Sequence, residues 1–308
     1  MTASRRTIPA VHAVRAFVLA AVAGSVASCA PHGGGGEAPA AGSAGAMALR
    51  AADGALPTVT VPVLADAERR RVGGLTCLWA RGIAEIRWTD ASGDHFEQGD
   101  LDLRWSAGQG IAASVSKFGD RHAWIGSDGE RWWRFAPKAI PSSLDVGPLR
   151  PPVGSDRSPV DECSVNPALL GIAPLVPEAR AVVEVRDGLA WVALDASVLP
   201  AGEGIRFDAG FDPVSLLPRR ARMLLDDGEV LWSAEYHDFV SVEQPGAPPG
   251  AWPKLPRRVV ALRGAGGASL LLVLDRCSID AGATDRPAMY DLGALRERFR
   301  PEVVRGMP

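Results

Sequence analysis

The sequence predicts a mainly β protein, a strongly curved antiparallel sheet of about 11 strands covered on one face by short helices. Apolar and polar residues alternate with period two in run after run, which is typical of half-buried strands. Turn dipeptides such as Asp-Gly and Gly-Asp separate these runs at hairpin spacing. Helical periodicity is confined to a few short stretches. A sheet of this size must close, curl or be covered on one face.

Residues 1–28 have the organisation of a lipoprotein signal peptide. A basic leader precedes an apolar run at 16–27, which is shorter than the roughly 20 residues needed to span a bilayer. The run ends in Val26-Ala27-Ser28-Cys29, which resembles the lipobox of bacterial lipoproteins. That resemblance implies that Cys29 is acylated, becomes the first mature residue and anchors the chain to a membrane. The alternative is an ordinary signal peptide with an incidental cysteine.

The mature chain divides into a tether and one domain. Residues 29–46 are rich in Gly, Ala and Pro and have no apolar period, so we expect a flexible tether. Residues 47–308 are long enough for a single domain with a substantial core. Ala30 follows the cysteine, and by the sorting rule of enteric bacteria the absence of aspartate there favours the outer membrane, facing the periplasm.

Charge and motif content restrict the function classes. The net charge of −3 gives no electrostatic reason to expect nucleic-acid binding. No nucleophile elbow, zinc-binding helix or dinucleotide fingerprint occurs, so we expect no catalytic residues, no metal and no cofactor. Export would permit one disulfide among Cys77, Cys163 and Cys277, and the sequence leaves the pairing open.

The first half of the domain is predicted to form a short helix followed by a meander of antiparallel strands. Residues 66–78 are expected to form the helix, although Gly73-Gly74 weakens its C-terminal half. Five strands then follow, joined by short turns. They are expected at 82–88, 95–105, 111–118, 122–126 and 131–135.

The middle of the domain interrupts the strands. Residues 137–159 are rich in Pro, Ser, Gly and Asp and are expected to be irregular. Residues 161–172 are expected to form a short helix with Pro167 near its first turn, where proline is tolerated. Its apolar side chains need a hydrophobic surface to cover. They are Leu169, Leu170 and Ile172.

Strands resume after this segment, and a last helix follows them. The strongest hairpin signals are Asp187-Gly188 and Asp226-Asp227-Gly228. The final helix begins at Asp291, a suitable N-cap, and has Leu292, Leu295 and Phe299 at helical spacing. The later strands are expected at 181–185, 189–194, 204–209, 219–225, 229–240, 257–262 and 269–275.

Three motifs occur in order along the predicted strands: Gln98-Gly99-Asp100-Leu101, then Ser127-Asp128-Gly129, then Trp133, Phe135 and Pro137. In residue type and spacing they resemble the LolA/LolB-like family of periplasmic lipoprotein carriers and receptors. The resemblance extends over roughly residues 65–300. It implies a half-open antiparallel barrel wrapped on a helical lid, with an apolar concave face that receives the acyl chains of a client lipoprotein.

The chain departs from the family pattern in two places. The carrier's Arg-Pro pair, whose arginine helps to hold the lid shut, corresponds here to Trp105-Ser106, with Arg104 one residue early. A shift of one residue along a strand turns a side chain to the opposite face, so Arg104 is a poor substitute. The receptor's protruding apolar loop corresponds here to the short polar Gly119-Asp120-Arg121.

The candidate ligand site is therefore apolar. Tryptophans on predicted strands either line a lipid cavity or fill the core, and the apolar side chains of the 161–172 segment form the inner face of a lid. The candidate ligand-binding residues are Trp88, Trp105, Trp124, Trp133, Leu169, Leu170 and Ile172.

The leading functional hypothesis is a membrane-anchored envelope protein, not an enzyme, that binds acyl chains, other lipids or acylated lipoproteins and could serve in lipoprotein sorting. The main alternative is a structural or sensory lipoprotein that binds an envelope protein partner. An envelope hydrolase ranks third, because catalytic groups can meet in space without a sequence motif.

Overall fold

The computed structural model describes residues 59–90, 93–107, 110–128, 130–148, 167–172, 175, 182–194, 205–264, 268–279 and 289–306. The signal peptide, Cys29 and the tether lie outside these residues, as does Cys163. Processing and lipidation of the chain therefore stay predictions.

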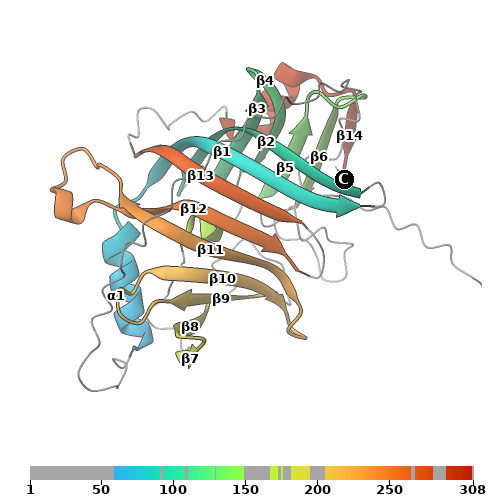
Figure 1. The fold of residues 1–308 in the computed structure, drawn as a ribbon. Helices are drawn as coiled ribbons and strands as arrows, with labels where there is room; N and C mark the ends of the chain where they lie inside the picture. Colours follow the sequence, from blue (N-terminus) through green and yellow to red (C-terminus); the bar gives the residue numbers. More distant parts are fainter. Residues whose placement is uncertain are drawn as a thin grey trace, which may run out of the picture.

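Within the described residues, a single curved sheet of 14 strands forms the body of the protein (Figure 1). Every neighbouring pair of strands is antiparallel except β14 and β6, which run parallel. The order across the sheet is β14-β6-β5-β4-β3-β2-β1-β13-β12-β11-β10-β9-β8-β7, so β14 and β7 are its two edges. The first six strands are β1 (Cys77–Asp90), β2 (Gly93–Ser106), β3 (Gly110–Lys117), β4 (Asp120–Ser127), β5 (Arg131–Ala136) and β6 (Ser143–Pro148).

The second half of the sheet follows the same meander. Its strands are β7 (Glu184–Arg186), β8 (Leu189–Leu194), β9 (Ile205–Phe211), β10 (Pro218–Leu225), β11 (Val230–Ser241), β12 (Lys254–Arg263), β13 (Ser269–Ser278) and β14 (Val303–Arg305). Strand β13 pairs with β1 and joins the two halves. The prediction of a mainly β, curved and open antiparallel sheet is thus confirmed, with 14 strands in place of about 11.

Turn chemistry accounts for the tightest hairpins. Asp187 and Gly188, between β7 and β8, have φ of 53° and 74°. Phe118 and Gly119, between β3 and β4, have φ of 52° and 83°. Two consecutive positive φ values give the turn geometry whose twist matches that of the flanking strands, and glycine adopts it without steric cost.

Two strands lie where the sequence predicted none. Strand β6 falls in the segment predicted to be irregular, and that prediction was wrong for residues 143–148. Its pairing with β5 is reinforced by an ion pair of 2.6 Å between Arg134 and Asp145. The three-residue strand β14 is parallel to β6, and such a short edge strand has almost no sequence signal of its own.

The helices also differ from the prediction. Helix α1 spans Val61–Val72, not 66–78: Pro62 lies in its first turn, Gly73 caps it, and strand β1 takes Cys77 and Leu78. Of the predicted helix at 161–172 the structure describes a 3-10 turn, η1 (Pro167–Leu170). The short η3 (Pro249–Ala251) precedes β12. Helix α4 (Leu292–Phe299) has the predicted cap, since the Asp291 carboxylate accepts from the amide of Ala294 at 3.0 Å.

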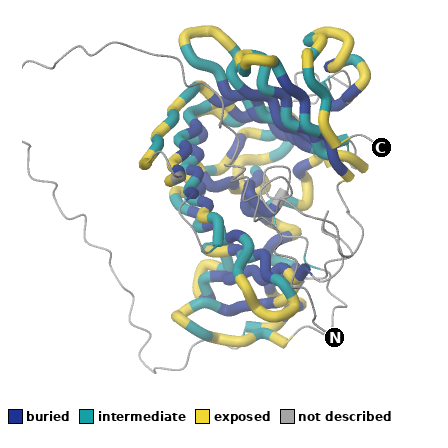
Figure 2. Tube along the Cα trace, turned by 90° about the vertical axis from the view of Figure 1, so that its right-hand side faces the viewer, coloured by how far each residue is buried: buried dark blue, intermediate teal, exposed yellow. Residues whose placement is uncertain are grey.

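The buried side chains form two clusters on opposite faces of the sheet (Figure 2 shows the burial along the chain). The main core lies on the concave face and includes residues of α1, η1 and most strands. The second cluster lies on the outer face of β3–β6, where α4 covers it. Within β3, adjacent Ile111 and Ala112 belong to different clusters, as period-two alternation requires.

Cys77 and Cys277 are both free thiols in this structure. Cys77 is buried and its sulfur lies 3.5 Å from the carbonyl oxygen of Ile279. Burial raises the pKa of the Cys277 thiol to about 11. These two cysteines therefore do not pair with each other.

Candidate functional site

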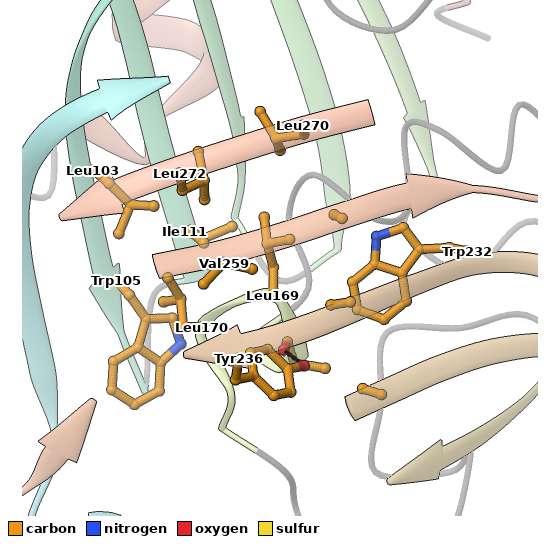
Figure 3. Close-up of a cluster of buried hydrophobic side chains, with 14 of the residues drawn as sticks. Leu103, Trp105, Ile111, Leu169, Leu170, Trp232, Tyr236, Val259, Leu270 and Leu272 are labelled. Carbon is orange, nitrogen blue, oxygen red and sulfur yellow. Dashed lines mark hydrogen bonds between the residues drawn. The ribbon is translucent and has the colours of Figure 1, made fainter. Parts of the chain in front are cut away.

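The segment 167–172, which we call the lid, lies against the concave face of the sheet. Leu169 and Leu170 are 4% and 1% exposed and belong to the main core. Figure 3 shows them among Trp105, Val259 and Tyr236, which come from β2, β12 and β11. The lid thus covers part of the apolar concave surface of the sheet.

One end of the lid is held by a tyrosine of the sheet. The Tyr236 hydroxyl donates a hydrogen bond to the carbonyl oxygen of Ala168 (dashed line in Figure 3). Tyr236 is among the most deeply buried side chains, and burial raises its pKa well above the ordinary value of 10.0. A neutral hydroxyl is the form that can donate, so burial and the hydrogen bond favour the same protonation state.

The other end of the lid is held by a buried arginine of helix α1. The Arg71 guanidinium donates to the carbonyl oxygen of Gly171 and, at 2.7 Å, to that of Lys254 at the start of β12. Glu68, one helical turn earlier, accepts from Arg71 Nε at 2.8 Å. Both side chains are about 5% exposed. One buried ion pair therefore connects α1, β12 and the lid, and it stays buried because its charges are paired.

Gly171 ends the 3-10 turn in a left-handed conformation, with φ of 70°. Its amide donates to the carbonyl of Ala168 at 3.0 Å. A side chain at this position would lie in ordinary contact distance of Pro256 and Tyr236, so the conformation, rather than lack of space, favours glycine.

The structure divides the predicted ligand-site residues between the two clusters. Leu169, Leu170, Trp88 and Trp105 belong to the main core, and Ile172 packs against it partly buried. Trp124 and Trp133 lie instead in the second cluster, on the outer face of the sheet, with α4 over them. These two tryptophans therefore face away from the concave surface on which the ligand site was predicted.

Sequence reasoning missed the polar groups that hold the lid. Glu68 and Arg71 have helical i, i+3 spacing, which a surface ion pair would also show, so the spacing alone did not identify them. Tyr236 and Trp232 lie at alternate positions of the predicted strand 229–240, and that alternation placed them on one face without showing that the lid contacts it.

The two departures from the carrier pattern have structural outcomes. Arg104 points to the outer face, opposite to Trp105, and its guanidinium lies 4.7 Å from the Trp79 ring centroid. Arg71 of α1 is the arginine that reaches the lid. The prediction that Arg104 faces away from the concave surface is therefore confirmed.

The turn between β3 and β4 is less polar than its sequence suggested. Phe118 is fully exposed there, and so is Ile140 in the connection between β5 and β6. An ion pair of 2.9 Å between Lys138 and Asp120 joins these two connections. This end of the sheet therefore presents two large apolar side chains to solvent.

The described residues offer little for polar chemistry on the concave face. Within the described ranges, no three His, Cys, Asp or Glu side chains gather closely enough to hold a metal ion. None of the described helices has the length and apolar character to cross a membrane. Hollows of about 500 Å³ occur on the outer face around Arg81, Asp275 and Arg276, where opposite charges alternate. The concave face thus provides an apolar surface and a lid.

Together these features define a class of protein, an open and curved antiparallel sheet with an apolar concave face, on which the segment 167–172 is held by hydrogen bonds from Tyr236 and Arg71. No protein-family description matches the chain, and no curated protein matches it. Several solved structures are similar to this chain. One is a LolA superfamily protein from Nitrosomonas europaea, 14% identical, covering 72% of this chain and 94% of its own, with a TM-score of 0.43.

Two further solved structures are similar over comparable lengths. An outer membrane lipoprotein-sorting protein domain from Vibrio parahaemolyticus is 11% identical and covers 75% of this chain and 98% of its own, with a TM-score of 0.47. A DUF1329 family protein from Desulfovibrio piger is 12% identical and covers 77% of this chain and 100% of its own, with a TM-score of 0.49. These are likenesses of fold, and they say nothing about the ligand of this chain.

Proposed function

We propose that this protein holds the acyl chain of a lipid or lipoprotein on the concave face of its sheet, in place of the lid. The observation that carries the proposal is that the contact between the lid and the sheet is mainly apolar. Leu169 and Leu170 bury their side chains on the sheet, while the main polar attachments of the lid are the hydrogen bonds from Tyr236 and Arg71. An acyl chain could replace the apolar contacts of the lid at little cost, because hydrophobic burial is non-directional.

The lid segment is suited to exchange with a ligand. Burying a leucine side chain stabilises by about 1.5–3 kcal/mol, so two leucines contribute only a few kcal/mol. An acyl chain contributes about 0.8 kcal/mol for each buried CH₂, so a few methylenes match that amount. A longer chain would favour the state in which the lid has moved once it also offsets the hydrogen bonds that Tyr236 and Arg71 lose, about 1–3 kcal/mol for each buried group.

Native mass spectrometry of residues 47–308, purified without detergent, tests the proposal. We expect adducts with lipid masses that disappear in organic solvent. Leu170→Asp should abolish them, because a carboxylate on the concave face opposes both lid and lipid. Leu295→Asp is the matched control, since Leu295 is also buried but lies in the second cluster. Retention unchanged by Leu170→Asp, or a protein that remains free of adducts after incubation with phospholipid, would contradict the proposal.

A second candidate function is binding of an envelope protein partner. It is favoured by the filling of the concave face, where Trp232, Tyr236 and Leu170 are all fully buried. A protein whose core is complete needs no ligand, and its exposed surfaces would then be the functional ones. A clean apoprotein mass together with capture of a folded envelope protein by the intact domain would select this candidate.

Anchoring at Cys29 would place the domain beside a bilayer. The exposed side chains of Phe118 and Ile140 would then give a second contact with the interfacial region, where apolar side chains flanked by charges are favoured. Localisation to the outer membrane, facing the periplasm, is part of this proposal.

A further inference from the structure

We propose that the outer face of β7–β10 carries a binding site for a phosphate group, either inorganic phosphate or the headgroup of an anionic phospholipid. Its residues are Arg186, Trp191, Arg206, Asp208 and Arg222. The site is separate from the lid, because Phe207 and Ala209, the neighbours of Asp208 in β9, point into the main core.

Three arginines from three strands converge on a single carboxylate. Asp208 lies 3.3 Å from Arg186 of β7 and 3.0 Å from Arg222 of β10, both through Oδ2. Arg206 of β9 approaches the other oxygen, Oδ1, through Nε at 3.1 Å. The Asp208 side chain is only 7% exposed, whereas the arginines are 25–52% exposed. The carboxylate therefore holds the guanidiniums in position from below and leaves part of each one open to solvent.

A tryptophan fixes two of these arginines from the side. The guanidinium carbons of Arg222 and Arg186 lie 4.1 Å and 4.9 Å from the Trp191 ring centroid. Gly210 stands opposite Trp191 in the register, and a Cβ there would come within 3.0–3.1 Å of the indole. The glycine thus lets the ring lie flat on β9. Held by both the carboxylate and the ring, the arginines would lose little further side-chain entropy when they bind an anion.

The charges at this site do not balance. Three guanidiniums face the carboxylate of Asp208, and Glu184, which stands opposite Trp191 on the same face, adds one exposed carboxylate. Arg220, the next arginine on this face, is already paired with Glu235 at 3.0 Å. Among the described residues of this face, three positive and two negative charges leave a surplus of one positive charge, so an anion would reduce the repulsion between the guanidiniums.

Buried N–H donors that lack an acceptor are a second, independent indication of a bound anion at this site. Arg186 Nε, Arg222 Nε and Trp191 Nε1 are buried and have no hydrogen-bond acceptor among the described residues. Such donors are uncommon in folded proteins, and an ordered water or ion is a usual explanation. One guanidinium can donate two parallel hydrogen bonds to two oxygens of a phosphate group. A phosphate group is therefore a better fit here than a monatomic anion.

The test is isothermal titration calorimetry on the full chain, purified in a maltoside detergent, with inorganic phosphate as the probe. Saturable binding is expected. Arg206→Gln and Arg222→Lys should each weaken it about tenfold, the effect of losing one charge-assisted hydrogen bond. Arg220→Gln is the matched control and should leave affinity within about twofold, because Arg220 lies on the same face but is paired with Glu235.

A second arm distinguishes the source of the phosphate. Phosphatidylglycerol vesicles are titrated alongside inorganic phosphate, and thermal melts confirm that each variant folds. Arg206→Gln retains the contacts of Asp208 with Arg186 and Arg222, so it keeps the test valid if Arg222→Lys does not fold. Binding of vesicles that depends on these arginines identifies a headgroup, and binding of free phosphate alone identifies the ion. No saturable binding to either probe, or binding unchanged in Arg206→Gln, would overturn the proposal.

Discussion

The guanidinium of Arg71 donates to the carbonyl oxygen of Gly171, 100 positions later in the chain. This contact ties helix α1 to the lid on the concave face of the sheet. The same guanidinium is paired with Glu68 in a nearly inaccessible environment. Arg71 therefore contributes both to the position of the lid and to the stability of the α1 region.

Arg71→Met should lower the free energy of unfolding by about 3–5 kcal/mol, because it removes the guanidinium charge that faces the buried Glu68 carboxylate. The double variant Glu68→Leu/Arg71→Met removes both charges and should recover most of that loss. Chemical denaturation measures the stability of both.

Both variants also remove the donor to Gly171, so amide exchange at the lid should be faster than in the parent protein even where global stability is recovered. Lid exchange unchanged in the double variant would show that Arg71 supports the fold without holding the lid.

Tyr236→Phe should change how stability depends on pH. Burial raises the pKa of Tyr236 in the folded protein above its value near 10 in the unfolded chain. The contribution of the neutral Tyr236 hydroxyl to the free energy of unfolding is therefore fully present below about pH 10 and is lost as the pH rises further. Below that pH the variant should be less stable by about 0.5–1.5 kcal/mol, since it loses the hydrogen bond from the hydroxyl to Ala168, while the Ala168 carbonyl still accepts from the amide of Gly171. The gap between the two proteins should narrow in alkaline solution. Cys277 titrates in both proteins and cancels in the comparison, and a gap that widens would contradict this account.

Gly171→Ala should destabilise by about 1–2 kcal/mol, the cost of a left-handed conformation for a residue with a Cβ. Gly171→Asn should cost less, because asparagine tolerates this region. Gly250→Ala is the control, since a Cβ there meets no atom within 4 Å. Thermal melts of the three variants provide the comparison, and equal losses in Gly171→Ala and Gly250→Ala would exclude a conformational cause.

Trp105→Ala and Trp133→Ala should each cost about 3–5 kcal/mol, because each empties a well-packed position. Only Trp105→Ala should alter retention of an acyl chain, since Trp105 contributes to the main core and Trp133 packs under α4. Native mass spectrometry of both variants tests this. Loss of lipid adducts in Trp133→Ala alone would place the ligand on the other face.

The sequence by itself determined the local structure. Period-two alternation located most strands, and Asp187-Gly188 predicted a hairpin that the structure contains. The cap at Asp291 followed from residue type alone. The cluster of apolar residues at 169–172 identified a segment that needed a surface to cover, and that segment is the lid.

Only the tertiary structure decided which face of each strand is inside. Alternation shows that Trp132 and Trp133 point to opposite faces of the sheet. Because α4 covers the outer face of β3–β6, apolar side chains are buried on both faces there. The sequence pattern therefore cannot show which of the two tryptophans faces the main core. The strand β6 and the contact between Arg71 and Gly171 depend on pairings between distant parts of the chain. Such pairings are set by the packing of the whole sheet, because a residue's neighbours in the sequence do not determine its partners in space.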